Sequence, residues 1–206
     1  MKDALPQTIY LKDYQVSPFL VDTTDLVFDL GDEQTRVTAN LAVRRNPDSS
    51  DKAAVLELNS KGDVQLQWIA IDGQRLDSSA YSIADNLLRV PNLSDSCVIS
   101  TEVLIQPQLN TSMMGLYRSR TMYCTQCEAE GFRRITYFPD RPDIMSVFTV
   151  KIVADKASYP VLLSNGNAIE RADLDGGRHS VTWHDPFKKP SHLFALVAGT
   201  LSVVED

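Results

Sequence analysis

Alternation between apolar and polar residues constrains the fold of this chain more than any other feature. Apolar side chains take every second position in residues 26–30 and again in residues 37–43, and the turn-forming residues 31–34 separate the two segments. A repeat of two residues places these side chains on one face of an extended backbone, which is the pattern of a half-buried β-strand. The two segments therefore predict a β-hairpin.

The same pattern continues along the chain, where extended segments alternate with turn signals such as Asp72–Gly73. Further strands are expected at residues 55–58, 64–71, 81–83, 87–90, 97–105, 148–154, 159–163, 180–183 and 193–204. The first hundred residues contain no apolar stripe of helical period. We therefore predict an all-β fold, a saddle-like β-sandwich or open barrel of mostly antiparallel strands, with at most a short helical turn near 143–147.

The last apolar stretch, residues 193–204, bears on domain organisation. It is too apolar for an edge strand and needs cover on both faces, yet only two residues follow it. Residues 1–206 are therefore expected to form a single β domain that ends at a domain boundary, with more protein after it.

Composition and charge exclude several classes of partner. The chain has 206 residues, enough to bury a core, and a net charge of -7 without the clustered Lys and Arg that follow a phosphate backbone. No run approaches the roughly 20 apolar residues of a membrane span, and residues 1–6 do not resemble a signal peptide. Three cysteines, an odd number, fit a reducing compartment. We expect a soluble, cytoplasmic protein that binds neither nucleic acid nor membrane.

Polar chemistry is concentrated in residues 124–133, which read CTQCEAEGFR. Residues 107–123 form the longest irregular stretch of the chain and lead into this segment. A loop on a rigid sheet is a common position for functional groups. The segment is therefore the first place to look for a site.

Cys124 and Cys127 form a C-x-x-C pair that is open to three interpretations. A redox pair of the thioredoxin type requires a βαβ context, which the predicted sheet lacks. A structural zinc site needs two further ligands, and Cys97 with scattered histidines makes a poor second half. Packing of both thiols is favoured, and the metal and redox alternatives stay open.

Other catalytic signatures are missing from the sequence. His179, His184 and His192 are the only histidines, and none belongs to an H-E-x-x-H motif, so we expect surface or turn histidines. The sequence contains neither a G-x-S-x-G elbow nor a phosphate-binding glycine loop. No catalytic residue and no metal ligand are therefore predicted in this chain.

Gln126 and Glu128 are the candidate binding residues. Two positions apart on an extended backbone, their side chains point to the same side and offer an amide oxygen beside a carboxylate. This pair suits a primary ammonium, which brings three donors and a positive charge. Glu130 would share that side if the strand stayed regular, but Gly131 offers a place to bend. A solvated acidic loop is the alternative interpretation of these carboxylates.

Several ordered motifs together resemble one family. They are residues 124–133, Ile135–Tyr137, Asp140–Asp143, Ala154–Lys156, Leu163–Asn167, Asp185–Phe187 and Leu193–Gly199. In this set the chain resembles the N-terminal domain of bacterial aminopeptidases of the M1 family of zinc metallopeptidases. The resemblance covers nearly the whole chain and is strongest from residue 115 onward.

The resemblance implies a β-rich first domain that lies against a catalytic domain of the same polypeptide, which would follow residue 206. It implies that Glu128 and Gln126, in the family's Q-x-E motif, bind the α-amino group of peptide substrates with a free N-terminus. The zinc ligands and the general base of the family belong to the catalytic domain, so this chain alone is expected to bind no zinc and to be inactive. The parent enzyme would act in peptide catabolism.

A different class of function remains as the alternative, a freestanding β-sandwich module that binds a protein or another ligand without catalysis. It predicts an exposed aromatic or apolar patch. Trp68 and Trp183 lie in predicted strands, where core packing is their expected use.

Overall fold

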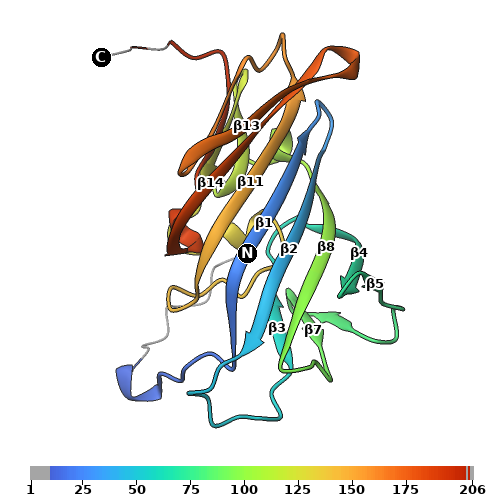
Figure 1. Cartoon of the computed structure of the whole chain (residues 1–206), viewed down its shortest axis with the longest axis vertical. Coiled ribbons are helices and arrows are strands. Elements are labelled where there is room, and N and C mark those ends of the chain that lie inside the picture. Colours follow the sequence, from blue (N-terminus) through green and yellow to red (C-terminus); the bar gives the residue numbers. More distant parts are fainter. Residues whose placement is uncertain (1–9, 203, 205–206) are drawn as a thin grey trace.

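The fold is built on one large twisted sheet with two smaller sheets against it, as the computed structural model shows for residues 10–202 and 204 (Figure 1). The strands are β1 (Phe19–Leu30), β2 (Thr35–Arg45), β3 (Leu56–Asn59), β4 (Gln65–Ile71), β5 (Gln74–Arg75), β6 (Ser82–Ala84), β7 (Leu87–Val90), β8 (Ser96–Ile105), β9 (Gly115–Ser119), β10 (Met122–Gln126), β11 (Met145–Asp155), β12 (Val161–Ser164), β13 (Asn167–Leu174), β14 (Arg178–Pro190) and β15 (Leu196–Gly199). The helices of these residues are short 3-10 turns: η1 (Leu11–Asp13), η2 (Pro107–Leu109), η3 (Phe132–Arg134), η4 (Asp175–Gly177) and η5 (Ser191–Leu193). The predicted all-β class is confirmed.

The large sheet has the strand order β13-β14-β11-β1-β2-β8-β4-β5, and its edges do not close into a barrel. The predicted hairpin forms its centre, where β1 pairs antiparallel with β2 and Phe28 faces Val37. β1 and β11 pair in parallel, while the other neighbouring strands of this sheet are antiparallel, in agreement with the mostly antiparallel prediction.

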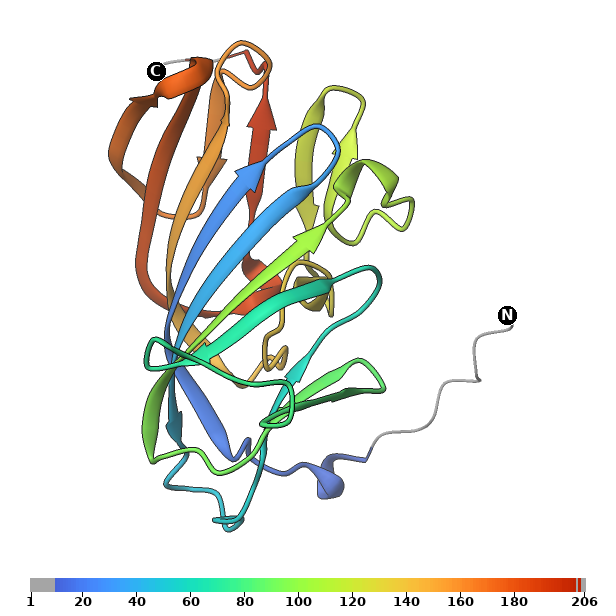
Figure 2. The same ribbon diagram turned by 90° about the vertical axis from the view of Figure 1, so that its right-hand side faces the viewer.

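The second layer is a four-stranded sheet of order β12-β15-β10-β9. In Figure 2 the β9–β10 hairpin and β15 stand beside the upper part of the large sheet, and the third sheet, β3-β7-β6, lies toward the lower end. Of the described part of the last apolar stretch, residues 193–202 and 204, only β15 is strand, and β12 and β10 flank it on both sides. This agrees with the expectation that the stretch avoids a sheet edge.

An aromatic cluster joins the two layers at the level of η3. The ring of Phe132 lies 4.9 Å from that of Phe138, 6.0 Å from that of Phe148 and 5.3 Å from that of Phe194, all measured between centroids. Phe132 is fully buried. Edge-to-face contacts of this kind add to the hydrophobic gain of burial, so η3 is held firmly in the core.

Two local predictions need correction. Residues 107–123 are not irregular throughout, because β9 lies within them and pairs with β10. Strand β13 was not predicted at all, since its residues are mostly exposed and do not alternate.

Near 143–147 the chain makes one hydrogen-bonded turn, from the amide of Ile144 to the carbonyl of Arg141, and β11 begins at Met145.

Two expectations about location bear on the N-terminus and on membranes. The residues on which we predicted the lack of a signal peptide lie outside the described residues. Within residues 10–202 and 204, no helix has the length and apolar character needed to cross a membrane.

Candidate functional site

The candidate binding residues lie where β10 ends. Gln126 is the last residue of β10 and pairs with Gly115 of β9. On its other side β10 pairs with β15, through Tyr123 with Ala198 and Cys124 with Val197. A strand held on both sides by neighbours delivers its final residue to a defined position.

Gln126 and Glu128 were expected on one side of an extended backbone, but β10 ends at Gln126 and Glu128 lies in the turn that follows. Both residues are exposed, whereas Cys127 between them is 2% exposed and belongs to the core. The side-chain Nε2 of Gln126 donates to the backbone oxygen of Glu128 over 3.3 Å. The peptide bond from Glu128 to Ala129 is cis. An amide and a carboxylate therefore lie at one exposed tip.

Glu130 departs from this pair because the chain turns. The amide of Gly131 donates to the oxygen of Cys127 over 2.7 Å, which closes the turn 127–131. Glu130 lies 3.3 Å from Nη1 of Arg133 in an ion pair. No such ion pair to Glu128 occurs among residues 10–202 and 204, so its carboxylate is available to a cation from outside.

Arg133 links this turn to a buried carboxylate. Its Nε lies 3.0 Å from Oδ2 of Asp140, whose side chain is 1% exposed. The backbone amide of Arg133 also donates to Oδ2, over 3.2 Å, and its Nη2 donates to the Asp140 backbone oxygen over 2.9 Å. Ser191 donates its hydroxyl to Oδ1 of the same carboxylate. A buried charge with this many donors is well compensated.

Arg133 and Asp140 were not named among the predicted binding residues. The spacing of Glu130 and Arg133, three residues apart, was visible in the sequence and is an ordinary distance for a pair on one helical turn. The contact to Asp140 depends on the fold of the following loop and left no such signal.

Two glycines allow the turn to pack against β9. A Cβ on Gly131 would lie 2.3 Å from the carbonyl oxygen of Gln126 and 3.1 Å from the amide nitrogen of Gly115. Gly115 has φ of +76°, and its Cβ would lie 2.7 Å from the Cβ of Arg134. Side chains larger than hydrogen would therefore separate the turn from β9.

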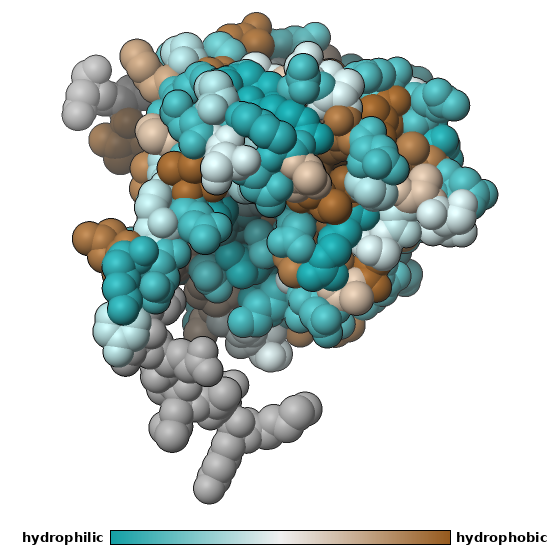
Figure 3. Space-filling model, turned by 90° about the horizontal axis from the view of Figure 1, so that it is seen from below, coloured by the Kyte–Doolittle hydropathy of each residue, from teal (hydrophilic) through white to brown (hydrophobic). Residues whose placement is uncertain are grey.

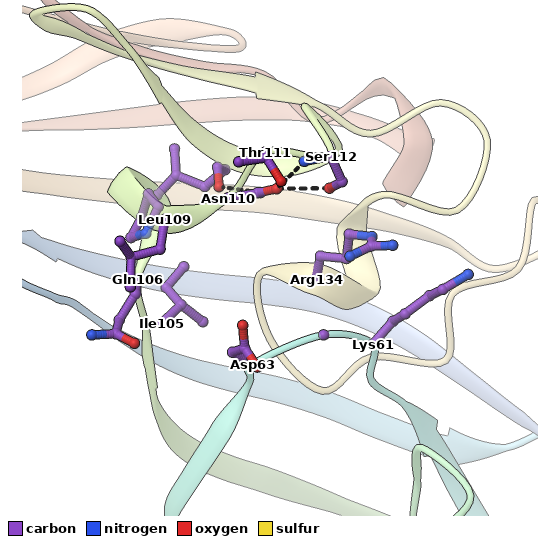
Figure 4. A pocket seen from close by; sticks show the side chains of 12 residues that line it. Lys61, Asp63, Ile105, Gln106, Leu109, Asn110, Thr111, Ser112 and Arg134 are labelled. Carbon is purple, nitrogen blue, oxygen red and sulfur yellow. Dashed lines mark hydrogen bonds between the residues drawn. The ribbon is translucent and has the colours of Figure 1, made fainter. Parts of the chain in front are cut away.

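A hollow of about 180 Å³ lies beside η3 (Figure 4). Arg134, Lys61 and Asp63 line it, together with the loop that leads into β9. Asn110 holds this loop, because its Nδ2 donates to the oxygens of Met114 and Leu116 over 2.8 and 2.9 Å. Gln126 and Glu128 do not line this hollow.

The cysteines behave as packing thiols. Burial raises the pKa of Cys127, with a further contribution from the charge of Asp140, and burial also raises the pKa of Cys124. A redox-active thiol needs a lowered pKa, so the redox alternative is not supported. Within the described residues, no group of three or more His, Cys, Asp or Glu side chains is arranged to hold a metal ion.

The histidine prediction is wrong for one residue. His179 is buried in β14, and its Nε2 lies 2.8 Å from the backbone oxygen of Tyr159. His184 is partly buried in the same strand, and its Nδ1 lies 3.2 Å from Oγ1 of Thr149. Both imidazoles serve the packing of β14 against its neighbours.

Comparison with known proteins gives a consistent result. The pattern of the peptidase M1 N-terminal domain matches residues 22–193. Aminopeptidase N of Caulobacter vibrioides is 50% identical over 206 residues, 100% of this chain and 23% of that relative. This chain therefore spans about a quarter of the length of that relative.

Solved structures share the fold. Aminopeptidase A of Legionella pneumophila, solved in complex with aspartic acid, superposes with a TM-score of 0.89 at 35% identity, over 93% of this chain and 22% of that one. An M1 zinc metallopeptidase from Deinococcus radiodurans, bound to a Tyr-Ser-Ala substrate, gives a TM-score of 0.73 at 16% identity, over 88% and 42% of the two chains. The second likeness is one of fold alone.

Proposed function

The chain belongs to the peptidase M1 N-terminal domain family, and from this premise we propose that it anchors the substrate of a zinc aminopeptidase, which removes N-terminal amino acids from peptides. Glu128 and Gln126 bind the α-amino group of the substrate. The observation that carries the proposal is the exposed carboxylate of Glu128, which has no ion-pair partner among the described residues while Glu130 nearby is paired.

The chemistry of an exopeptidase explains the need for such a group. Only the first residue of a peptide carries an α-ammonium, so a carboxylate that binds it distinguishes a chain end from an interior peptide bond. Held at a fixed position relative to a catalytic centre, the carboxylate also determines which carbonyl reaches that centre. Glu128 thereby selects the terminus and sets the distance of one residue.

The zinc in this proposal is bound by a catalytic domain of the same polypeptide. That domain contributes the metal and the general base, and this chain contributes the amine anchor. The chain alone is therefore inactive. The free state of all three cysteines fits a parent enzyme that acts in peptide catabolism in the cytoplasm.

The size of the effect follows from electrostatics. Two opposite charges about 4 Å apart attract by about 4 kcal/mol at an effective dielectric constant near 20, before desolvation costs. Glu128 is exposed in this domain, so the full attraction requires the catalytic domain to exclude water from the pocket. Loss of one partner of a buried charge pair costs about 2–5 kcal/mol.

The test is Glu128→Ala in the full-length enzyme. We expect kcat/KM for aminoacyl substrates to fall by at least about 30-fold, which corresponds to about 2 kcal/mol. Glu33→Ala, at an exposed position in the β1–β2 turn, is the control and leaves kcat/KM at the wild-type value. Wild-type kinetics in Glu128→Ala would remove the anchor role.

The alternative, a freestanding binding module, receives little support from the face seen in Figure 3 or from the two indoles. Viewed from below, hydrophilic residues separate several small hydrophobic groups (Figure 3). Trp183 packs against the core and donates its Nε1 to the Leu162 oxygen over 3.1 Å, and Trp68 is partly buried with Arg75 over its ring. Neither indole forms an open aromatic platform.

A further inference from the structure

Three exposed residues, 128–130, form a tip between two fixed points. On one side the side chain of Cys127 is buried in the core. On the other side Phe132 is buried in the aromatic cluster, and Arg133 is bound to Asp140. The position of Glu128 therefore depends on how firmly the second point is held.

Asp140 holds the second of these points, η3, through several hydrogen bonds. Its carboxylate accepts hydrogen bonds from the amide and Nε of Arg133 and from the hydroxyl of Ser191. Its own amide donates to Oδ1 of Asn59 over 3.2 Å. The backbone oxygen of Arg133 in turn accepts from the amide of Lys61 over 2.9 Å. Asp140 thus joins η3 to η5 and to the end of β3.

Arg133 also gives the two carboxylates of the tip different partners, because it pairs with Glu130 and not with Glu128. Its Nη1 reaches Glu130, whose side chain is 64% exposed, while its Nε stays on Asp140. An arginine that turned away from Asp140 would no longer hold Glu130 at this place. Two free carboxylates would then lie two residues apart, and an ammonium would have more than one binding position.

We propose that Asp140 is a positioning residue for the amine-binding tip, acting through Arg133, so that of the two tip carboxylates only Glu128 receives the substrate ammonium. This inference rests on the proposed function of Glu128. Asp140 does not touch the substrate, and its effect passes through the guanidinium and the backbone of η3.

The experiment uses the full-length enzyme and measures how well it recognises an amine. The readout is the inhibition constant of the analogue without the amino group divided by that of the substrate amino acid, a ratio that is large when the enzyme recognises the amine. The variant is Asp140→Asn, which keeps the shape and removes the charge that holds Arg133. The matched control is Asp143→Asn, which breaks the ion pair with Arg141 in the same loop without contacting η3.

We expect Asp140→Asn to lower the ratio by about 10-fold, because displacement of a reacting group by a fraction of an ångström is costly in a preorganised site. Hydrogen exchange of peptides covering residues 127–134 should become faster in the same variant. Asp143→Asn should leave both measurements at the wild-type value. If Asp140→Asn does not fold, Ser191→Ala, which removes one donor to the carboxylate, should give a smaller loss in the same direction.

The outcomes separate this inference from the proposed function. If Glu128→Gln leaves the ratio unchanged, the anchor role itself fails. If Glu128→Gln collapses the ratio but Asp140→Asn, or Ser191→Ala in its place, stays within about twofold of wild type, Asp140 has only a structural role and the inference is overturned.

Discussion

At the residue scale, adjacent polar groups in this chain have different uses because their partners differ. Glu128 and Glu130 are chemically identical and two residues apart, yet Arg133 pairs with only one of them. Gln126 uses its amide nitrogen on a backbone oxygen, which leaves its side-chain oxygen free to accept from an ammonium. The division of roles follows from contacts, not from residue type.

Gln126→Ala should have a smaller effect than loss of Glu128. A neutral hydrogen bond contributes about 1 kcal/mol net, so kcat/KM should fall by about fivefold in the full-length enzyme. Gln67→Ala is a matched control, because Gln67 also donates to a backbone oxygen two residues away, over 3.2 Å, from an exposed position of β4. A loss at Gln126 as large as that at Glu128 would mean that the two roles are reversed.

The thiol of Cys127 should resist alkylation in the folded protein. Its raised pKa keeps the thiolate scarce at neutral pH, and the thiolate is the reactive form. Mass spectrometry after brief treatment with iodoacetamide should find Cys127 unmodified in native protein and modified in urea. Rapid native labelling of Cys127 would reopen the redox interpretation.

At the element scale, the turn 127–131 depends on a close contact with β9. The backbones of Gly131 and Gly115 pass close to each other, and a Cβ on Gly131 would lie 2.3 Å from the oxygen of Gln126, a distance that no side chain allows. The hairpin β9–β10 and the neighbour β15 then determine where the turn begins.

Gly131→Ala should therefore displace the tip as well as destabilise the domain. The added methyl would lie 2.3 Å from the oxygen of Gln126, and overpacking of this kind costs about 1–3 kcal/mol. We expect a lower Tm and a lower kcat/KM. Gly73→Ala is the control, since nothing lies within 4 Å of its Cβ and only its positive φ is strained. It should lower Tm and leave kcat/KM unchanged.

At the scale of the whole molecule, several carboxylates are paired in the folded state. Hydrogen bonds from Lys188, Arg141 and Lys189 lower the pKa values of three aspartates. These are Asp22, Asp143 and Asp185. A lowered folded-state pKa contributes stability that is complete above the unfolded pKa and is lost as pH falls through the folded pKa.

The free energy of unfolding should therefore decrease as the pH drops below about 4. Urea denaturation of the chain at a series of pH values measures this dependence. Asp143→Asn should make the dependence shallower, because one of the three contributions is removed. Identical slopes for wild type and Asp143→Asn would contradict the assignment.

The large-scale fold was open to prediction because its signal is local. In residues 26–30 and 37–43 every second side chain is apolar and buried, and the two segments form the central hairpin of the large sheet. Strand β13 lacked this alternation because it lies at the edge of the sheet, where most of its residues face solvent. Sequence patterns identify strands through their buried faces, so an exposed edge strand escapes them.

The amino-acid sequence by itself determined the all-β class, the central hairpin and the polar segment that contains Gln126 and Glu128. Each of these depends on neighbours within a few residues. Only the tertiary structure decided that β9 and β10 pair, that Arg133 takes Glu130 and that Asp140 holds Arg133. Arg133 and Asp140 are in turn held by Lys61, Asn59 and Ser191, which lie far from them in the chain. Burial of Phe132 and Asp140 brings these segments together. The exposed tip therefore depends on long-range packing, although its residues are adjacent in the chain.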